Sequence, residues 1–139
     1  MIRFNQIDHV AITVADLERS VRWYQEILGL EVDRDVAWKG PPMMMKVGGG
    51  SAIALFPASS KNLKLPPSSE QALGMKHFAL NVDLDQFEAT RSLLESRGID
   101  CTYQDHGSSI SIYLLDPDGY EVEITAWTPI KGKGGSISG

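Results

Sequence analysis

Cysteine is almost absent from this chain, since Cys101 is the only one among its 139 residues. A single thiol cannot form an intramolecular disulfide, which excludes a small secreted scaffold held together by disulfides. The opening residues, Met1 to Asn5, contain no apolar core of the kind found in a signal peptide. Together these absences predict a protein of the reducing cytoplasm.

Long apolar runs and an excess of basic residues are also missing. No stretch approaches the roughly 20 apolar residues that a membrane-spanning helix needs. The 13 basic side chains are outnumbered by 18 acidic ones, which gives a net charge of −5 and argues against a basic surface for nucleic acid. We therefore expect one compact domain that has neither a nucleic acid nor a membrane as its partner.

Residues 7–14 alternate in a way that predicts a strand with one buried face. Val10, Ile12 and Val14 fall on one side of this strand, and His9 falls on the other. The strand therefore presents an imidazole on the face that points away from the core.

A helix is expected over residues 17–28, after that first strand. Asp16 can cap its first turn, and Gly29 suits the left-handed position just beyond a helix end. Three further strands are expected at about residues 30–36, 43–47 and 52–56. The order of elements in this half of the chain is βαβββ.

The second half repeats this order at an offset of 68 to 69 residues. A capping-box pattern at Asp85 and Glu88 predicts the start of the second helix. The offset relates the following pairs: His9 with His77, Asp16 with Asp85, Gly29 with Gly98, and Ala54 with Glu123. The chain is therefore interpreted as a duplication. Its expected parts are a first module (5–58), a linker (59–73), a second module (74–128) and a flexible tail (129–139).

The last strand of the second module follows a predicted tight turn. Pro117 suits the first central position of that turn, and Gly119 tolerates the positive φ that closes it. Glu123 then lies on the polar face of the strand. If the two modules pair about a pseudo-twofold axis, it meets His9 and His77 as a set of two imidazoles and one carboxylate. Such a set leaves open positions on Fe(II) or Mn(II), with Zn(II) and Ni(II) as alternative metals.

The motifs that carry these residues also identify a family. Residues 9–12 (HVAI), 16–20 (DLERS), 77–80 (HFAL) and 116–123 (DPDGYEVE) resemble the vicinal oxygen chelate superfamily over residues 5 to about 127. This superfamily includes glyoxalase I, bleomycin and fosfomycin resistance proteins and extradiol dioxygenases. The resemblance implies an α+β fold in which two βαβββ modules form a cup-shaped mixed sheet around a metal site, with the helices on the outside. It also implies a homodimer.

The resemblance favours some members of the family over others. Glyoxalase I has a fourth ligand where this chain has Ala54, and the fosfomycin enzymes carry a threonine where this chain has Ala11. The spacing of His106, Tyr113 and Glu123 follows the signature of the extradiol dioxygenases, which implies that His106 and Tyr113 act beside the metal. One departure is that residues 51–54 contain no histidine, although those enzymes carry an acid–base histidine in this region.

Three functions follow as hypotheses. The first is a metal-dependent enzyme like the extradiol dioxygenases, acting on a substrate with two vicinal oxygens. The second is a lyase or isomerase of the glyoxalase kind, which needs an active-site base and no dioxygen. The third is a metal-free binding protein of the bleomycin-resistance type.

Overall fold

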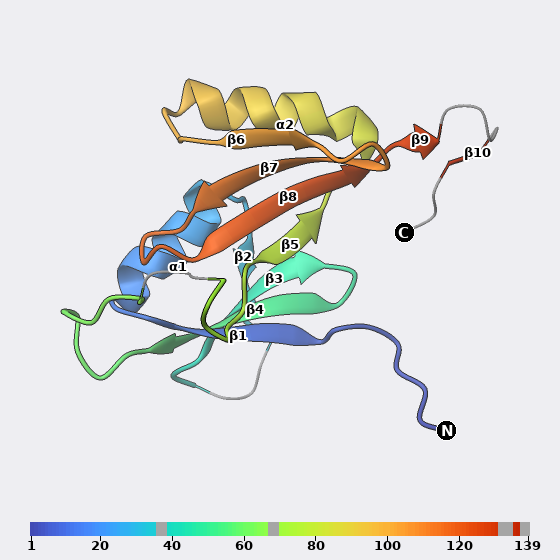
Figure 1. The fold of residues 1–139 in the computed structure, drawn as a ribbon. Helices are drawn as coiled ribbons and strands as arrows, with labels where there is room; N and C mark the ends of the chain where they lie inside the picture. Colours follow the sequence, from blue (N-terminus) through green and yellow to red (C-terminus); the bar gives the residue numbers. More distant parts are fainter. Residues whose placement is uncertain (36–38, 67–69, 131–134, 137–139) are drawn as a thin grey trace. The chain divides into compact units, whose positions relative to one another are not determined.

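The computed structural model describes residues 1–35, 39–66, 70–130 and 135–136. The chain divides into two compact units, Met1–Pro66 and Pro67–Gly139, which are described separately below (Figure 1). Neither described helix combines the length and the apolar character needed to span a membrane.

The first unit is a four-stranded mixed sheet with one helix. Its strands are arranged in the order β1-β4-β3-β2, with β1 parallel to β4 and the other pairs antiparallel. Its elements are β1 (His9–Val14), α1 (Leu17–Glu26), β2 (Glu31–Val32), β3 (Met43–Gly48) and β4 (Ser51–Pro57).

The second unit repeats the same topology. The strand order is β5-β8-β7-β6, again with one parallel pair, β5 with β8, and two antiparallel pairs. Its elements are β5 (Phe78–Asn81), α2 (Leu84–Ser96), β6 (Thr102–Asp105), β7 (Ser109–Leu115) and β8 (Glu121–Trp127). The predicted α+β class and the order βαβββ are confirmed in both units. A short pair follows, formed by β9 (Pro129–Ile130) and β10 (Gly135–Ser136).

Alternation along β8 separates the core of the second unit from its polar face. Val122 and Ile124 are buried and lie on the side of α2, where Phe87 and Leu94 are also buried. Burial of each such side chain contributes roughly 1.5–3 kcal/mol. Because successive strand residues point to opposite faces, Glu123 lies on the face away from α2.

Strand register supports the duplication residue by residue. Ala54 of β4 pairs with Ala11 of β1, and Glu123 of β8 pairs with Ala79 of β5 in the same way. On the other side of these strands, Met44 pairs with Ala54 as Tyr113 pairs with Glu123. The second unit therefore carries a tyrosine and a carboxylate where the first has a methionine and an alanine.

The structure differs from the sequence-based expectation at two helix and strand boundaries. The second helix begins at Leu84 with Asp83 as its N-cap, so the capping box predicted at Asp85 and Glu88 is wrong. Asp85 instead lies in the first turn, where its negative charge interacts favourably with the positive end of the helix dipole. β2 is also shorter than expected, because pairing with β3 is confined to Glu31 and Val32.

The predicted linker and tail stay predictions. The boundary between the two compact units falls within the linker expected at residues 59–73. Residues 131–134 and 137–139 of the expected flexible tail lie outside the described residues, as do residues 67–69 of the linker.

Candidate metal centre

The turn between β7 and β8 fixes the register on which the site depends. A single carboxylate oxygen, Oδ1 of Asp116, accepts hydrogen bonds from the backbone N–H groups of Asp118 and Tyr120, at 2.9 and 2.8 Å. Gly119 adopts a φ of 93°, as the turn prediction required. The turn thereby sets Tyr113 directly opposite Glu123 in the antiparallel pair.

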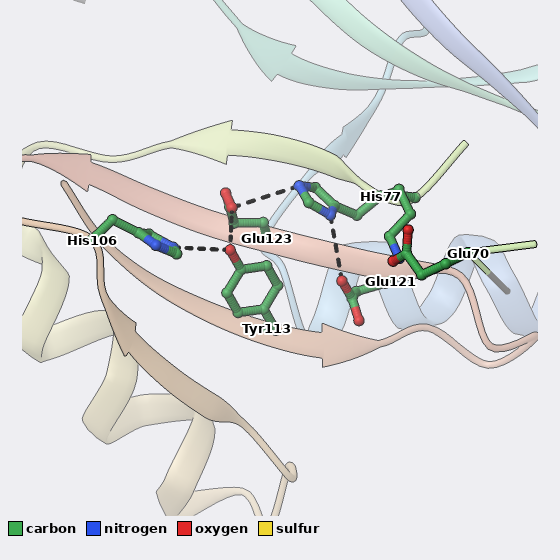
Figure 2. A network of polar contacts seen from close by, with 7 residues as sticks. Glu70, His77, His106, Tyr113, Glu121 and Glu123 are labelled. Atoms are coloured by element: carbon green, nitrogen blue, oxygen red, sulfur yellow. Dashed lines mark hydrogen bonds and ion pairs between the residues drawn. The ribbon is translucent and has the colours of Figure 1, made fainter. Parts of the chain in front are cut away.

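Glu123 is the buried carboxylate of this site, with 9% of its surface exposed. The hydroxyl of Tyr113 donates a hydrogen bond to Oε1 of Glu123 at 2.7 Å. Nε2 of His106 lies 3.1 Å from the same hydroxyl oxygen. Because a phenol has only one hydrogen and Tyr113 gives it to Glu123, His106 must donate through Nε2. The result is a directed chain of hydrogen bonds from His106 through Tyr113 to Glu123 (Figure 2).

The environment of Tyr113 favours its neutral form. Burial, followed by the hydrogen bond to Glu123 and the charge of that carboxylate, raises the pKa of Tyr113 to about 12. Tyr113 therefore acts as a hydrogen-bond donor at physiological pH, with no tendency to ionise.

His77 lies immediately before β5, next to the start of β8. Its Nε2 is 3.6 Å from Oε1 of Glu123, and its Nδ1 is 3.4 Å from Oε1 of Glu121 (Figure 2). The ring also meets Tyr113 edge to face, with 5.6 Å between ring centroids. Glu123 and Glu121 therefore lie beside the two different nitrogens of one imidazole.

His9 occupies the matching place in the first unit, at the start of β1. Its Nδ1 lies 2.7 Å from Oδ2 of Asp8, and its side chain is 45% exposed. The acid partner leaves Nε2 as the nitrogen for another ligand. His9 and His77 thus share an arrangement in which Nδ1 faces a carboxylate.

The donor set of the second unit fits part of a metal site. Two ligands of one octahedral ion lie roughly 3 Å apart, and the 3.6 Å between Nε2 of His77 and Oε1 of Glu123 is close to that spacing. Across the described ranges, no group of three or more His, Cys, Asp or Glu side chains is arranged to hold an ion. The second unit supplies an imidazole and a carboxylate, which are suitable donors for iron or manganese, and a 2-His-1-carboxylate set would need one further histidine.

The predicted site residues are thus distributed over the two units. His77, Glu123, Tyr113 and His106 converge in the second unit, whereas His9 belongs to the first. The complete ligand set of His9, His77 and Glu123 stays a prediction.

Sequence reasoning missed the acid partners of the two histidines. Asp8 precedes His9 directly, and Glu121 shares a strand face with Glu123, so both signals were present in the sequence. The contact of Glu121 with His77 depends on the parallel register of β5 and β8, which a single sequence does not give.

Two βαβββ units with the same strand order and register define a class of proteins built by duplication of one module. The chain belongs to the Glyoxalase/Bleomycin resistance protein/Dioxygenase superfamily, whose family model matches residues 6–124. The family expected from the sequence motifs is thereby confirmed.

Similar proteins carry the names of several different enzymes. The glutathione transferase FosA of Serratia marcescens is 27% identical over 118 residues, which cover 85% of this chain and 78% of that protein. A catechol-2,3-dioxygenase of Bacillus subtilis is also 27% identical, over 88% of this chain but only 42% of the dioxygenase. In fold, the chain resembles a glyoxalase/dioxygenase of Nostoc punctiforme with a TM-score of 0.72 and 21% identity, over 88% of this chain and 91% of that one.

Proposed function

We propose that this protein is a divalent-metal-dependent enzyme in which His9, His77 and Glu123 hold Fe(II) or Mn(II). Its substrate is a small molecule with two vicinal oxygens, and ring-cleaving dioxygenation of a catechol-like diol is the proposed reaction. The observation that carries this proposal is the convergence of Nε2 of His77 on Oε1 of Glu123, on the polar face of β8.

The duplication supports His9 as the third ligand. His9 and His77 are related by the repeat, both have a carboxylate beside Nδ1, and both are left with Nε2 as the donor. Ala54 takes the position of Glu123 in the first unit and has no donor atom. Three protein ligands then leave about three positions on an octahedral ion, which suits a chelating diol and one further ligand.

The side chains around the ligands have separate tasks. When bound, the metal supplies Lewis acidity to the substrate oxygens and, if it is iron, the redox chemistry of ring cleavage. Tyr113 orients Glu123 by donating to Oε1. His106 donates to Tyr113 and can pass a proton along this chain. Tyr113→Phe should therefore slow turnover more than it weakens substrate binding.

The reaction is expected to be slow or limited to few substrates. Residues 51–54 hold no histidine, and a positioned acid–base group typically contributes a factor of roughly 10²–10⁴ to the rate. The names of the similar proteins include a transferase as well as a dioxygenase, so they support an enzyme more strongly than a particular reaction. Ala54 in place of a fourth ligand weighs against lyase chemistry of the glyoxalase kind.

Metal content is the first test. The protein is purified without chelator, loaded anaerobically with Fe(II), Mn(II), Zn(II) or Ni(II), and analysed for bound metal. We expect about one ion per chain, and its loss in His9→Ala, His77→Ala and Glu123→Ala, because two remaining donors hold an ion weakly. His106→Ala is the matched control, since this exposed histidine belongs to the network but not to the ligand set.

Activity is the second test. Oxygen uptake and formation of ring-fission product are measured with the iron-loaded protein across a panel of catechols. Isomerisation of a glutathione hemithioacetal without oxygen consumption would replace the dioxygenase proposal with a lyase. Absence of stoichiometric metal under every loading condition would contradict both and favour a metal-free binding protein.

We further propose a homodimer located in the cytoplasm. The dimer is supported by the family and by the exposed outer strand β6, all of whose residues are accessible. The cytoplasmic setting is supported by the single free cysteine, Cys101.

A further inference from the structure

We propose that Glu121 is a positioning residue that keeps the ring hydrogen of His77 on Nδ1 and so directs Nε2 toward Glu123. The purpose of this arrangement, metal binding through Nε2, rests on the proposed function. The tautomer of the His77 ring rests on geometry alone and can be measured without metal.

The His77 ring is held on three sides. Glu121 lies 3.4 Å from Nδ1, Glu123 lies 3.6 Å from Nε2, and Tyr113 packs against the ring edge to face (Figure 2). Oε1 of Glu123 already accepts the hydrogen of Tyr113 at 2.7 Å, which makes it the weaker competitor for a hydrogen on His77. Glu121 lies closer to His77 and is the better acceptor, so it favours the tautomer with hydrogen on Nδ1.

A difference between the two units supports this role independently. The repeat that relates His9 to His77 also places Lys76 where the first unit has Asp8. The second unit therefore lacks the acid that precedes the histidine and faces its Nδ1 in the first unit.

In the second unit, an acid from the neighbouring strand β8 takes the place of the missing one. Ala52 pairs with His9 in the first unit, and the repeat relates Ala52 to Glu121. Each unit thus has one acid at one of two alternative positions, and in both units that acid faces Nδ1 of the histidine. The recurrence of the same contact from two different sequence positions indicates a requirement for the ring orientation. Carboxylate partners of this kind orient histidine ligands in metal sites.

The charges around Glu121 are compatible with the role. Lys76 attracts Glu121 electrostatically but forms its own ion pair with Glu70. Glu121 is half-buried, with 41% of its side chain exposed, so its negative charge carries only a modest desolvation cost.

The experiment compares the wild type with four variants of the full chain. Glu121→Ala removes the acceptor, and Glu121→Gln keeps an acceptor oxygen without the charge. The double variant Lys76→Asp, Glu121→Ala transfers the arrangement of the first unit to the second. Glu88→Ala is the matched control, because it removes the same charge from the exposed face of α2.

The first readout is the tautomer of His77 in the metal-free protein, observed by NMR of the ring nitrogens at a pH where the imidazole is neutral. We expect the Nδ1–H form in the wild type, Glu121→Gln and Glu88→Ala, and a shift toward the Nε2–H form in Glu121→Ala. The double variant should restore the Nδ1–H form. A merely structural role for Glu121 would not move this signal or explain its rescue.

The second readout is Zn(II) affinity, measured by competition with a chelator. We expect Glu121→Ala to lose roughly tenfold to a hundredfold, with partial recovery in Glu121→Gln and in the double variant. The inference is overturned if wild-type His77 is in the Nε2–H form, or if Glu121→Ala changes neither the tautomer nor the affinity. A tautomer shift in a protein that binds no metal would sustain the positioning role and refute the proposed function instead.

Discussion

Tyr113 and Glu123 face each other across β7 and β8 and share a 2.7 Å hydrogen bond in which the phenol is the donor. The pair lies on the face of β8 opposite to the buried Val122 and Ile124. Its geometry is therefore set by the packing of that strand and by the turn at Asp116. A carboxylate held in this way loses little rotamer freedom when it binds a ligand, which favours tight binding.

Tyr113 should resist ionisation. Burial and the neighbouring Glu123 raise its pKa to about 12, whereas an ordinary tyrosine ionises near pH 10. In an ultraviolet titration, the difference between wild type and Tyr113→Phe should show no tyrosinate near pH 10. Because the folded-state pKa is the higher one, the stabilising contribution of Tyr113 is complete below pH 10 and is lost as the pH rises toward 12. Tyrosinate in the difference spectrum near pH 10 would contradict this prediction.

The core beneath α2 should be sensitive to truncation. Phe87 is wholly buried, and Phe87→Ala is expected to lower the free energy of unfolding by roughly 3–5 kcal/mol. Leu93→Ala in the same helix is the control, since Leu93 is 49% exposed and its truncation should cost about 0.5 kcal/mol or less. Denaturant titration of the metal-free proteins measures both. Equal losses in the two variants would show that α2 does not pack as described.

The N-terminus of α1 should make stability depend on pH. Asp16 accepts a hydrogen bond from the N–H of Arg19 at 3.1 Å and lies 3.5 Å from Nζ of Lys61, and the former contact is the main cause that lowers the pKa of Asp16. A lowered pKa gives a contribution that is present above about pH 4 and is lost as the pH falls further.

Two substitutions separate the cap from the charge at Asp16. At neutral pH the thermal midpoint should fall from wild type to Asp16→Asn and again to Asp16→Ala, since the amide keeps the acceptor but loses the charge. The gap between wild type and Asp16→Asn should close in acid, and the gap between the two variants should remain. A gap that persists unchanged at low pH would exclude the charge as its source.

Assembly is open to a direct measurement. A homodimer should scatter light as twice the 15.3 kDa chain at micromolar concentration. β6 lies at the edge of its sheet, and edge strands offer unpaired backbone groups to a second chain. A proline substitution at Asp105 in β6, whose backbone N–H points away from β7, should shift the mass toward the monomer if this edge is the interface. A monomer in the wild type would refute the proposed dimer.

Local patterns in the sequence were sufficient for most of the fold. Period-two alternation identified the buried side of β1 and of β8, and glycine identified the ends of both helices, where Gly29 and Gly98 each adopt a φ of 70°. The duplication then predicted the equivalence of Ala54 and Glu123, which the strand register supports.

Two kinds of feature were harder to predict: the choice between neighbouring residues of the same type, and contacts that depend on strand register. Asp83 and Asp85 are both residue types that cap helices. Asp83 is the N-cap because its backbone is extended, whereas Asp85 is already within the helix. The partner of His77 was missed because Glu121 is remote in sequence and is brought close only by the parallel pairing of β5 with β8. The ligand role of His9 stays a prediction, because His9 belongs to a different unit from His77 and Glu123.

The matching registers of β4 and β8 give the two strands equivalent positions for protein engineering. Ala54 and Glu123 stand at the same register position, beside Ala11 and Met44 in the first unit and beside Ala79 and Tyr113 in the second. Ala54→Glu together with Met44→Tyr would install a copy of the Tyr113–Glu123 pair in the first unit. A gene built from two such halves can acquire or discard a polar group by single substitutions while its strand topology remains the same, which offers a short evolutionary route between different chemistries.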